Sequence, residues 1–187
     1  MLVSSYFRYM RSMAVAAALL ALVGGCARQH TEGGPTPPAT AEILIRDTAV
    51  APGGSSELGL LIVLADGWHT YTDPPGDSGM PPMFDITWPD GVIPGTALFP
   101  AHKAFTDTAG TTFGFEGAVL VRLPFTVADT IPPGTTLSLA GQVDYLICRE
   151  ICTAQSAPVD ISFTVATEKK QSEKWSKAAQ RGGWKGK

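Results

Sequence analysis

The stretch TTLSLAGQVDYLICREICTAQSAPVDISFTVA, residues 135–166, contains the pattern that decides the fold. The residues up to Ile147 and those from Pro158 onward are rich in apolar and β-branched side chains, which is typical of strands. Two cysteines, Cys148 and Cys152, lie between these runs. We therefore predict that the cysteines lie at the connection between two strands.

Further apolar and β-branched runs precede this stretch, and residues that favour turns separate them. No window between Ala41 and Ala166 sustains the periodicity of a helix. The sequence therefore predicts an all-β sandwich of about seven strands or more. The other predicted strands are EILIRDTAV (42–50), SELGLLIVLA (56–65), MFDITWP (83–89) and GAVLVRLPFTV (117–127).

The overall composition is that of an ordinary small globular chain, with 187 residues, 44% hydrophobic, 17% charged and a formal net charge of -3. One folded domain is expected from this length. The body of the chain is mildly acidic, and its basic segment is the tail, residues 167–187, so no nucleic-acid partner is expected. Within the tail we predict a short helix at SEKWSKAAQ (172–180), followed by a disordered Gly-rich end.

The amino terminus has the pattern of a secretory signal. In RYMRSMAVAAALLALVGGC, residues 8–26, the positive charges of Arg8 and Arg11 precede a short apolar run and then small residues. The apolar run, residues 13–23, is about half of the ~20 residues that a membrane-spanning helix needs. A signal peptide over residues 1–25 is therefore predicted in preference to a transmembrane anchor.

The last residues of this signal, LVGGC, resemble the bacterial lipobox, in which the cysteine is lipidated after cleavage. We therefore predict lipidation of Cys26 and attachment of an envelope protein to the membrane, with plain secretion as the alternative. The Pro-, Gly- and Thr-rich residues 26–40 are expected to form a flexible linker. The folded domain is predicted at residues 41–166, and the basic tail follows it.

Lipidation of Cys26 leaves Cys148 and Cys152 as a pair. In an extended strand, residues four apart are about 13 Å from each other, whereas a disulfide needs Cα atoms about 4.4–6.8 Å apart. A bond therefore requires a turn between them, and closing so short a loop stabilises the fold little. This favours a redox-active pair over a structural disulfide without excluding either. Arg149 would stabilise a thiolate beside it, and Glu150 would oppose it.

One alternative function is suggested by GDSGMP, residues 76–81, which resembles the nucleophile loop of chymotrypsin-like serine proteases. Met80 stands where those enzymes have a second glycine, and the histidines available as a base are His69 and His102. A tight turn built from the Pro and Gly residues of this segment is the favoured interpretation.

A second alternative is a soft-metal site for Cu(I) or Zn. Met80, Met83, His69 and His102, together with the cysteine pair, are suitable ligand types. Their spacing matches no standard structural zinc site, which uses closely paired ligands. We therefore predict neither a metal nor another cofactor.

Three segments of the chain together contain four short motifs: DGWHTYTDPPGDSGMPPMFDITWPDGV (66–92), FGFEGAVLVRLPF (113–125) and VDYLICREICTAQSAPVDISF (143–163). The motifs are Trp-His-Thr-Tyr at 68–71, Pro-Gly-Asp-Ser-Gly at 75–79, Gly-Phe-Glu-Gly at 114–117 and Leu-Ile-Cys-x-x-x-Cys at 146–152. In this order they resemble the amino-terminal periplasmic domain family of the thiol:disulfide interchange protein DsbD and its ScsB relatives. Phe115 and Ile147 replace a tyrosine and a valine of the family pattern.

The resemblance implies an immunoglobulin-like sandwich in which Cys148 and Cys152 are the pair that exchanges disulfides. It also implies an aromatic cap loop over one cysteine, with Tyr71 as a candidate neighbour or a plain core residue. The further supporting candidates are His69, Arg149 and Glu150. Trp68 and Trp88 are expected to be core residues.

The resemblance further implies that the chain acts as a protein-disulfide reductase or exchange component in the periplasm. In DsbD this domain is fused to a membrane-embedded and a thioredoxin-like domain, whereas this sequence ends at Lys187. We therefore expect a separate membrane-embedded thiol reductase or thioredoxin-like protein as electron donor, and disulfide-bearing periplasmic proteins as acceptors. The alternative is a non-enzymatic envelope lipoprotein with a structural disulfide, acting as a scaffold or in copper tolerance.

Overall fold

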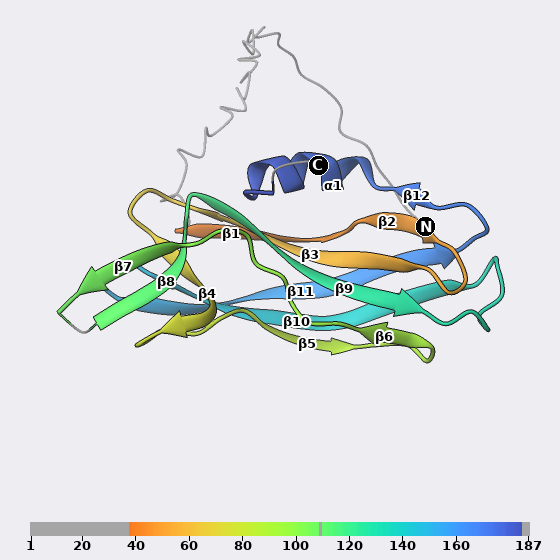
Figure 1. The fold of residues 1–187 in the computed structure, drawn as a ribbon, viewed down its shortest axis with the longest axis horizontal. Coiled ribbons are helices and arrows are strands. Elements are labelled where there is room, and N and C mark those ends of the chain that lie inside the picture. The colour runs from red at the N-terminus through yellow and green to blue at the C-terminus, as the bar shows by residue number, and fades with distance from the viewer. Residues whose placement is uncertain (1–37, 109, 185–187) are drawn as a thin grey trace, which may run out of the picture. The chain divides into compact units, whose positions relative to one another are not determined.

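The computed structural model of the chain describes residues 38–108 and 110–184. The predicted signal peptide, lipidated Cys26 and all but the last residues of the predicted linker lie outside these ranges. Within the described residues, the strands form two sheets stacked as a sandwich (Figure 1). The prediction of an all-β, immunoglobulin-like sandwich is confirmed. No helix in the described ranges is long and apolar enough to span a bilayer.

The first sheet has four strands and the second has eight. In spatial order, the first contains β1 (Ala39–Ile45), β3 (Ser55–Leu64), β9 (Ala118–Val127) and β6 (Val92–Pro94). The second contains β12 (Lys170–Gln171), β2 (Asp47–Val50), β11 (Cys152–Val165), β10 (Thr136–Cys148), β4 (His69–Gly76), β8 (Gly110–Glu116) and β7 (Lys103–Asp107). β5 (Met83–Thr87) pairs with β10 beside this path. All six runs predicted as strands form strands.

The main core fills the space between the sheets. In β3, Leu58, Leu60 and Ile62 point into this core and are fully buried. Leu61, between them, points to the opposite face and is also buried, because a second apolar cluster covers that face. β3 therefore reads as a continuous apolar run, since both of its faces are covered.

The second cluster is made by α1 (Glu173–Arg181), which Figure 1 shows beside β1 and β3. The helix predicted at residues 172–180 is therefore confirmed. Trp175 is its anchor: a Cβ added to Gly59 would lie 2.6 Å from the Trp175 ring. The glycine on β3 thus leaves room for the indole, and Leu120 of β9 packs beside it.

The expected disorder of the Gly-rich end is wrong for the residues that the structure describes. The Gly182 carbonyl accepts a hydrogen bond from the Leu120 N–H at 3.2 Å. The Trp184 indole N–H donates to the Leu120 carbonyl at 2.7 Å, and the Arg122 guanidinium lies 4.1 Å from the Trp184 ring centroid. The composition suggested flexibility, but an indole that finds both a carbonyl and a cation is held in place.

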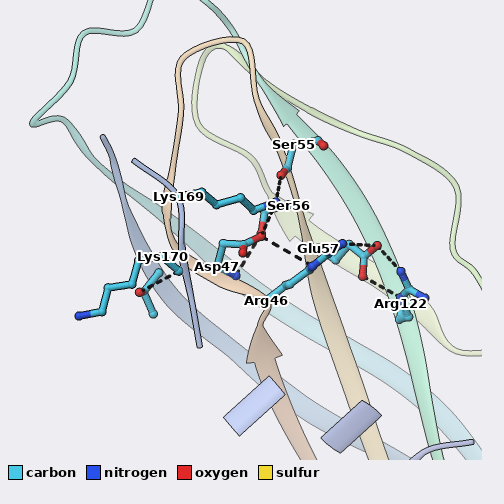
Figure 2. A network of polar contacts seen from close by, with 9 residues as sticks. Arg46, Asp47, Ser55, Ser56, Glu57, Arg122, Lys169 and Lys170 are labelled. Atoms are coloured by element: carbon cyan, nitrogen blue, oxygen red, sulfur yellow. Dashed lines mark hydrogen bonds and ion pairs between the residues drawn. The ribbon is translucent and has the colours of Figure 1, made fainter. Parts of the chain in front are cut away.

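Two buried carboxylates, Asp47 on β2 and Glu57 on β3, lie in a network of polar contacts that joins the two sheets (Figure 2). Asp47 accepts a 2.7 Å hydrogen bond from the Ser56 hydroxyl and pairs with Lys169 at 3.0 Å. Glu57 pairs with the guanidinium groups of Arg46 and Arg122. Since a buried charge is tolerated only when it is paired, these contacts satisfy both acids. Lys169 also ties the segment before α1 to the body of the sandwich.

Candidate functional site

The two cysteines close the end of the hairpin formed by β10 and β11. The strands pair in register from Thr136 opposite Thr164 to Cys148 opposite Cys152. The cysteines form a disulfide with an S–S distance of 2.01 Å and a Cα–Cα distance of 4.0 Å. Residues 149–151 make the turn between them. The prediction that a bond requires a turn at the connection of two strands is confirmed.

The two sulfur-bearing residues differ in exposure, because their strands have different neighbours. Cys148 is 3% exposed, since β10 is flanked by β11 on one side and by β4, where His69 pairs with Cys148, on the other. Cys152 is exposed. The other neighbour of β11 is β2, which pairs only near Thr164 at the opposite end of the strand. One cysteine of the pair is therefore buried and the other is exposed.

Tyr71 on β4 contacts the sulfur of the buried cysteine. Its hydroxyl donates a hydrogen bond to Cys148 Sγ at 2.9 Å and lies 3.8 Å from Cys152 Sγ. The side chain is only 4% exposed. Burial raises the pKa of Tyr71, and the charge of Asp107 raises it further. The hydroxyl therefore stays protonated at neutral pH and remains a donor towards Cys148.

The Gly-Asp-Ser-Gly turn packs over the ring of Tyr71. Gly79 has a φ of +96°, and a Cβ at this position would lie 2.3 Å from the tyrosine ring. Asp77 fixes the turn to the start of β8, because its carboxylate accepts the Thr111 N–H at 2.7 Å and its own N–H donates to the Thr111 carbonyl at 2.9 Å. The segment that resembles a protease nucleophile loop is thus a turn that packs on the ring of Tyr71.

An aromatic side chain, His69, also contacts Tyr71 and is itself stacked on a further ring. His69 meets the tyrosine ring edge-on with centroids 5.4 Å apart, and it stacks on Phe105 of β7 at 4.9 Å. Burial lowers the pKa of His69, although the carboxylates of Glu116 and Asp107 oppose this shift. The imidazole therefore behaves mainly as a neutral ring that bridges Phe105 and Tyr71.

The turn between the cysteines carries the remaining predicted candidates. Arg149 and Glu150 are both exposed, and the Arg149 guanidinium lies 5.7 Å from the Trp68 ring centroid. Trp68 packs against the main core, as predicted, and also lines a small pocket beside this turn. Ile151, which sequence reasoning did not single out, is 77% exposed. Its type gives no signal, because isoleucine is among the residues most often buried.

The candidate metal ligands are spread over the site's surroundings. His69 packs between two aromatic rings, His102 meets Phe113 edge-on at 5.4 Å, and Met83 on β5 is 53% exposed. Across residues 38–108 and 110–184, no three His, Cys, Asp or Glu side chains gather as a set that could hold a metal ion.

Replacing Gly79 with alanine is expected to impair both stability and the placement of Tyr71. A residue other than glycine at positive φ costs about 1–3 kcal/mol, and at this position the new methyl group would also displace the tyrosine ring. Gly134→Ala is a matched control, because Gly134 has a φ of +93° and nothing within 4 Å of an added Cβ. Urea unfolding should show a larger loss for Gly79→Ala, and equal losses would contradict the packing role of this turn.

A family model and solved structures match this chain. The model of a family described as "Thiol:disulfide interchange protein DsbD, N-terminal" matches residues 40–163. The N-terminal periplasmic domain of ScsB from Proteus mirabilis aligns at 19% identity and a TM-score of 0.49, over 80% of this chain and 56% of that one. The reduced DsbD N-terminal domain of Neisseria meningitidis aligns at 13% identity and a TM-score of 0.30, over 70% of this chain and 90% of that one.

This chain therefore spans about 56% of the ScsB domain to which it was compared. No curated protein matched it.

Proposed function

Because this chain belongs to the family of DsbD N-terminal domains, we propose that it relays reducing equivalents through a dithiol–disulfide pair formed by Cys148 and Cys152. The donor is a membrane-embedded thiol reductase or a thioredoxin-like protein, and the acceptors are disulfide-bearing proteins of the periplasm. Lipidation of Cys26 holds the domain at the membrane near its donor. The observation that carries the proposal is the unequal exposure of the two cysteine residues, with a hydrogen-bond donor on the sulfur of the buried one.

Reduction of the domain begins at the exposed cysteine, Cys152. A donor thiolate attacks Cys152 Sγ, a mixed disulfide forms, and the Cys148–Cys152 bond breaks with its electron pair on Cys148. The Tyr71 hydroxyl already points at this sulfur, so it stabilises the leaving thiolate as the negative charge develops. The second thiolate of the donor then attacks the donor sulfur that is bonded to Cys152, and Cys152 leaves as a thiolate. The donor leaves as a disulfide and the domain is left as a dithiol.

Transfer to an acceptor reverses these steps. The exposed Cys152 thiolate attacks a disulfide of the acceptor and forms a mixed disulfide, which releases one acceptor thiolate. Cys148 then attacks Cys152 Sγ, which restores the disulfide of the domain and releases the second thiolate of the acceptor. Two electrons pass in each half-reaction, and both begin at Cys152.

Equilibration with glutathione redox buffers tests this function. A pair that works in exchange should have a reduction potential above about -300 mV, since structural disulfides of secreted proteins typically lie below that value. The redox state is measured by alkylating free thiols with a reagent that changes electrophoretic mobility. A potential far below this limit, together with no reaction towards reduced thioredoxin, would contradict the proposal.

Replacing Tyr71 with phenylalanine should slow exchange by about tenfold to a hundredfold. A hydrogen bond to a charged group contributes about 1.5–3 kcal/mol, and the phenylalanine ring keeps the packing against Gly79 while removing only the hydroxyl. The rate with dithiothreitol, followed by alkylation, measures the effect. The pH at which the reduced pair becomes reactive should also rise, and this second readout separates thiolate stabilisation from a structural defect.

Tyr145→Phe is the control for this variant, because Tyr145 is another buried tyrosine on the strand that carries Cys148. It should exchange at the wild-type rate. Equal rates for Tyr71→Phe and the wild type would remove the hydroxyl from the mechanism.

A further inference from the structure

The turn between the cysteines presents an unusually exposed apolar side chain. Ile151 is 77% exposed, which is the highest value among the large hydrophobic residues that the described part of the chain exposes. It lies directly before Cys152, which is the exposed cysteine of the pair. A single exposed isoleucine elsewhere on a surface needs no explanation, but this one stands beside the sulfur at which the proposed exchange begins.

A small pocket adjoins this side chain. It has a volume of about 160 Å³ and is lined by Trp68, Arg149, Glu150 and Ile151. Sites for small-molecule ligands usually measure about 300–1,000 Å³, so this one suits a single protein side chain better than a free ligand. Tryptophan and arginine are the residues most enriched where proteins bind each other tightly.

We propose that Ile151 and this pocket, together called the tip surface, recognise an apolar side chain next to the reacting cysteine of a protein redox partner. The inference rests on the proposed exchange at Cys152 and names the surface that selects the partner. Arg149 and Glu150 carry opposite charges, so the tip surface has no net charge and its contacts with a partner are mainly apolar.

The geometry of a mixed disulfide favours this contact. The two sulfurs of such a bond are about 2.05 Å apart, so the residues flanking the partner's cysteine must lie over those flanking Cys152. Ile151 is the apolar one of the two residues that flank Cys152, and covering it removes apolar surface from water. A thioredoxin-like protein, in which a reactive cysteine lies at the surface, is a partner of this kind.

Serine at position 151 provides the test in the full chain. Reduced thioredoxin serves as the protein probe and dithiothreitol as the small-molecule probe, and the rate of reduction of the disulfide is measured with each. We expect Ile151→Ser to lower the rate with thioredoxin about tenfold and to leave the rate with dithiothreitol within about twofold of the wild type. Ile151→Leu should retain most of the rate with thioredoxin.

Ile93→Ser is the matched control, because Ile93 on β6 is 66% exposed and belongs to the other sheet. It should leave both rates unchanged. The inference is overturned if Ile151→Ser reacts with thioredoxin as fast as the wild type does, or if both probes slow equally. A wild-type chain that reacts with neither probe would instead overturn the proposed function itself.

Discussion

Replacing Cys148 with serine is expected to abolish turnover and to trap partners as stable mixed disulfides. The variant keeps the exposed Cys152, which still attacks a disulfide of the partner, but it lacks the thiol that would resolve the product. Turnover with a protein disulfide should fall to background, which is the largest functional effect expected for a single substitution here. Non-reducing electrophoresis with and without dithiothreitol measures the trapped species.

Cys152→Ser is the matched variant and should behave differently. It also loses turnover, but the remaining Cys148 is 3% exposed and lies beneath Tyr71, so a protein disulfide cannot approach it. Few or no mixed disulfides should accumulate. Equal trapping by the two variants would contradict the assignment of Cys152 as the attacking residue, and trapping by Cys152→Ser alone would reverse it.

Replacing Trp175 with alanine is expected to give the largest loss of stability, about 3–5 kcal/mol in the free energy of unfolding. The indole fills the space above Gly59 and packs against Leu120, and it is 5% exposed. Urea unfolding measures the loss. Exchange with dithiothreitol should be unaffected in the folded variant, because Trp175 packs on the four-stranded sheet whereas the disulfide belongs to the eight-stranded sheet.

Two comparisons sharpen this prediction. Lys177→Ala, on the exposed side of the same helix, should change stability by less than about 0.5 kcal/mol. Gly59→Ala should destabilise the wild type, because its methyl group would lie 2.6 Å from the Trp175 ring and 2.9 Å from Leu120 Cδ1. It should cost less once Trp175 is alanine, because only the contact with Leu120 remains. A loss below about 1 kcal/mol for Trp175→Ala would mean that the tail is not part of the folded unit.

The strands that the sequence predicts are those with long apolar runs, and the missed ones have a physical reason. β4 reads as a loop because Pro74 and Pro75 lie within it and remove two hydrogen-bond donors. β7 and β8 are short or rich in Thr and Gly, and they form a hairpin at the edge of the sheet. Such strands depend on their neighbours rather than on their own composition.

At the site, the sequence predicted a cysteine pair at a turn between strands, but spacing alone does not distinguish the two sulfurs. Their difference arises because β4 covers Cys148, whereas β2 reaches only the far end of β11. The packing of Gly79 on Tyr71 likewise depends on tertiary structure, which the sequence spacing does not reveal. Motif resemblance indicated Tyr71 as a neighbour, and only the fold supplies the direction of its hydroxyl.

The hairpin that carries the disulfide has a consequence for how the two redox states compare. Backbone pairing continues from Thr136 opposite Thr164 up to the cysteines themselves, so the strands stay together whether or not the sulfurs are bonded. The oxidised and reduced forms of the domain should therefore have almost the same backbone conformation. A domain of this kind is poorly suited to signal its redox state through a change of conformation. It is well suited to fast exchange, because no refolding is needed between its reduction and its reoxidation.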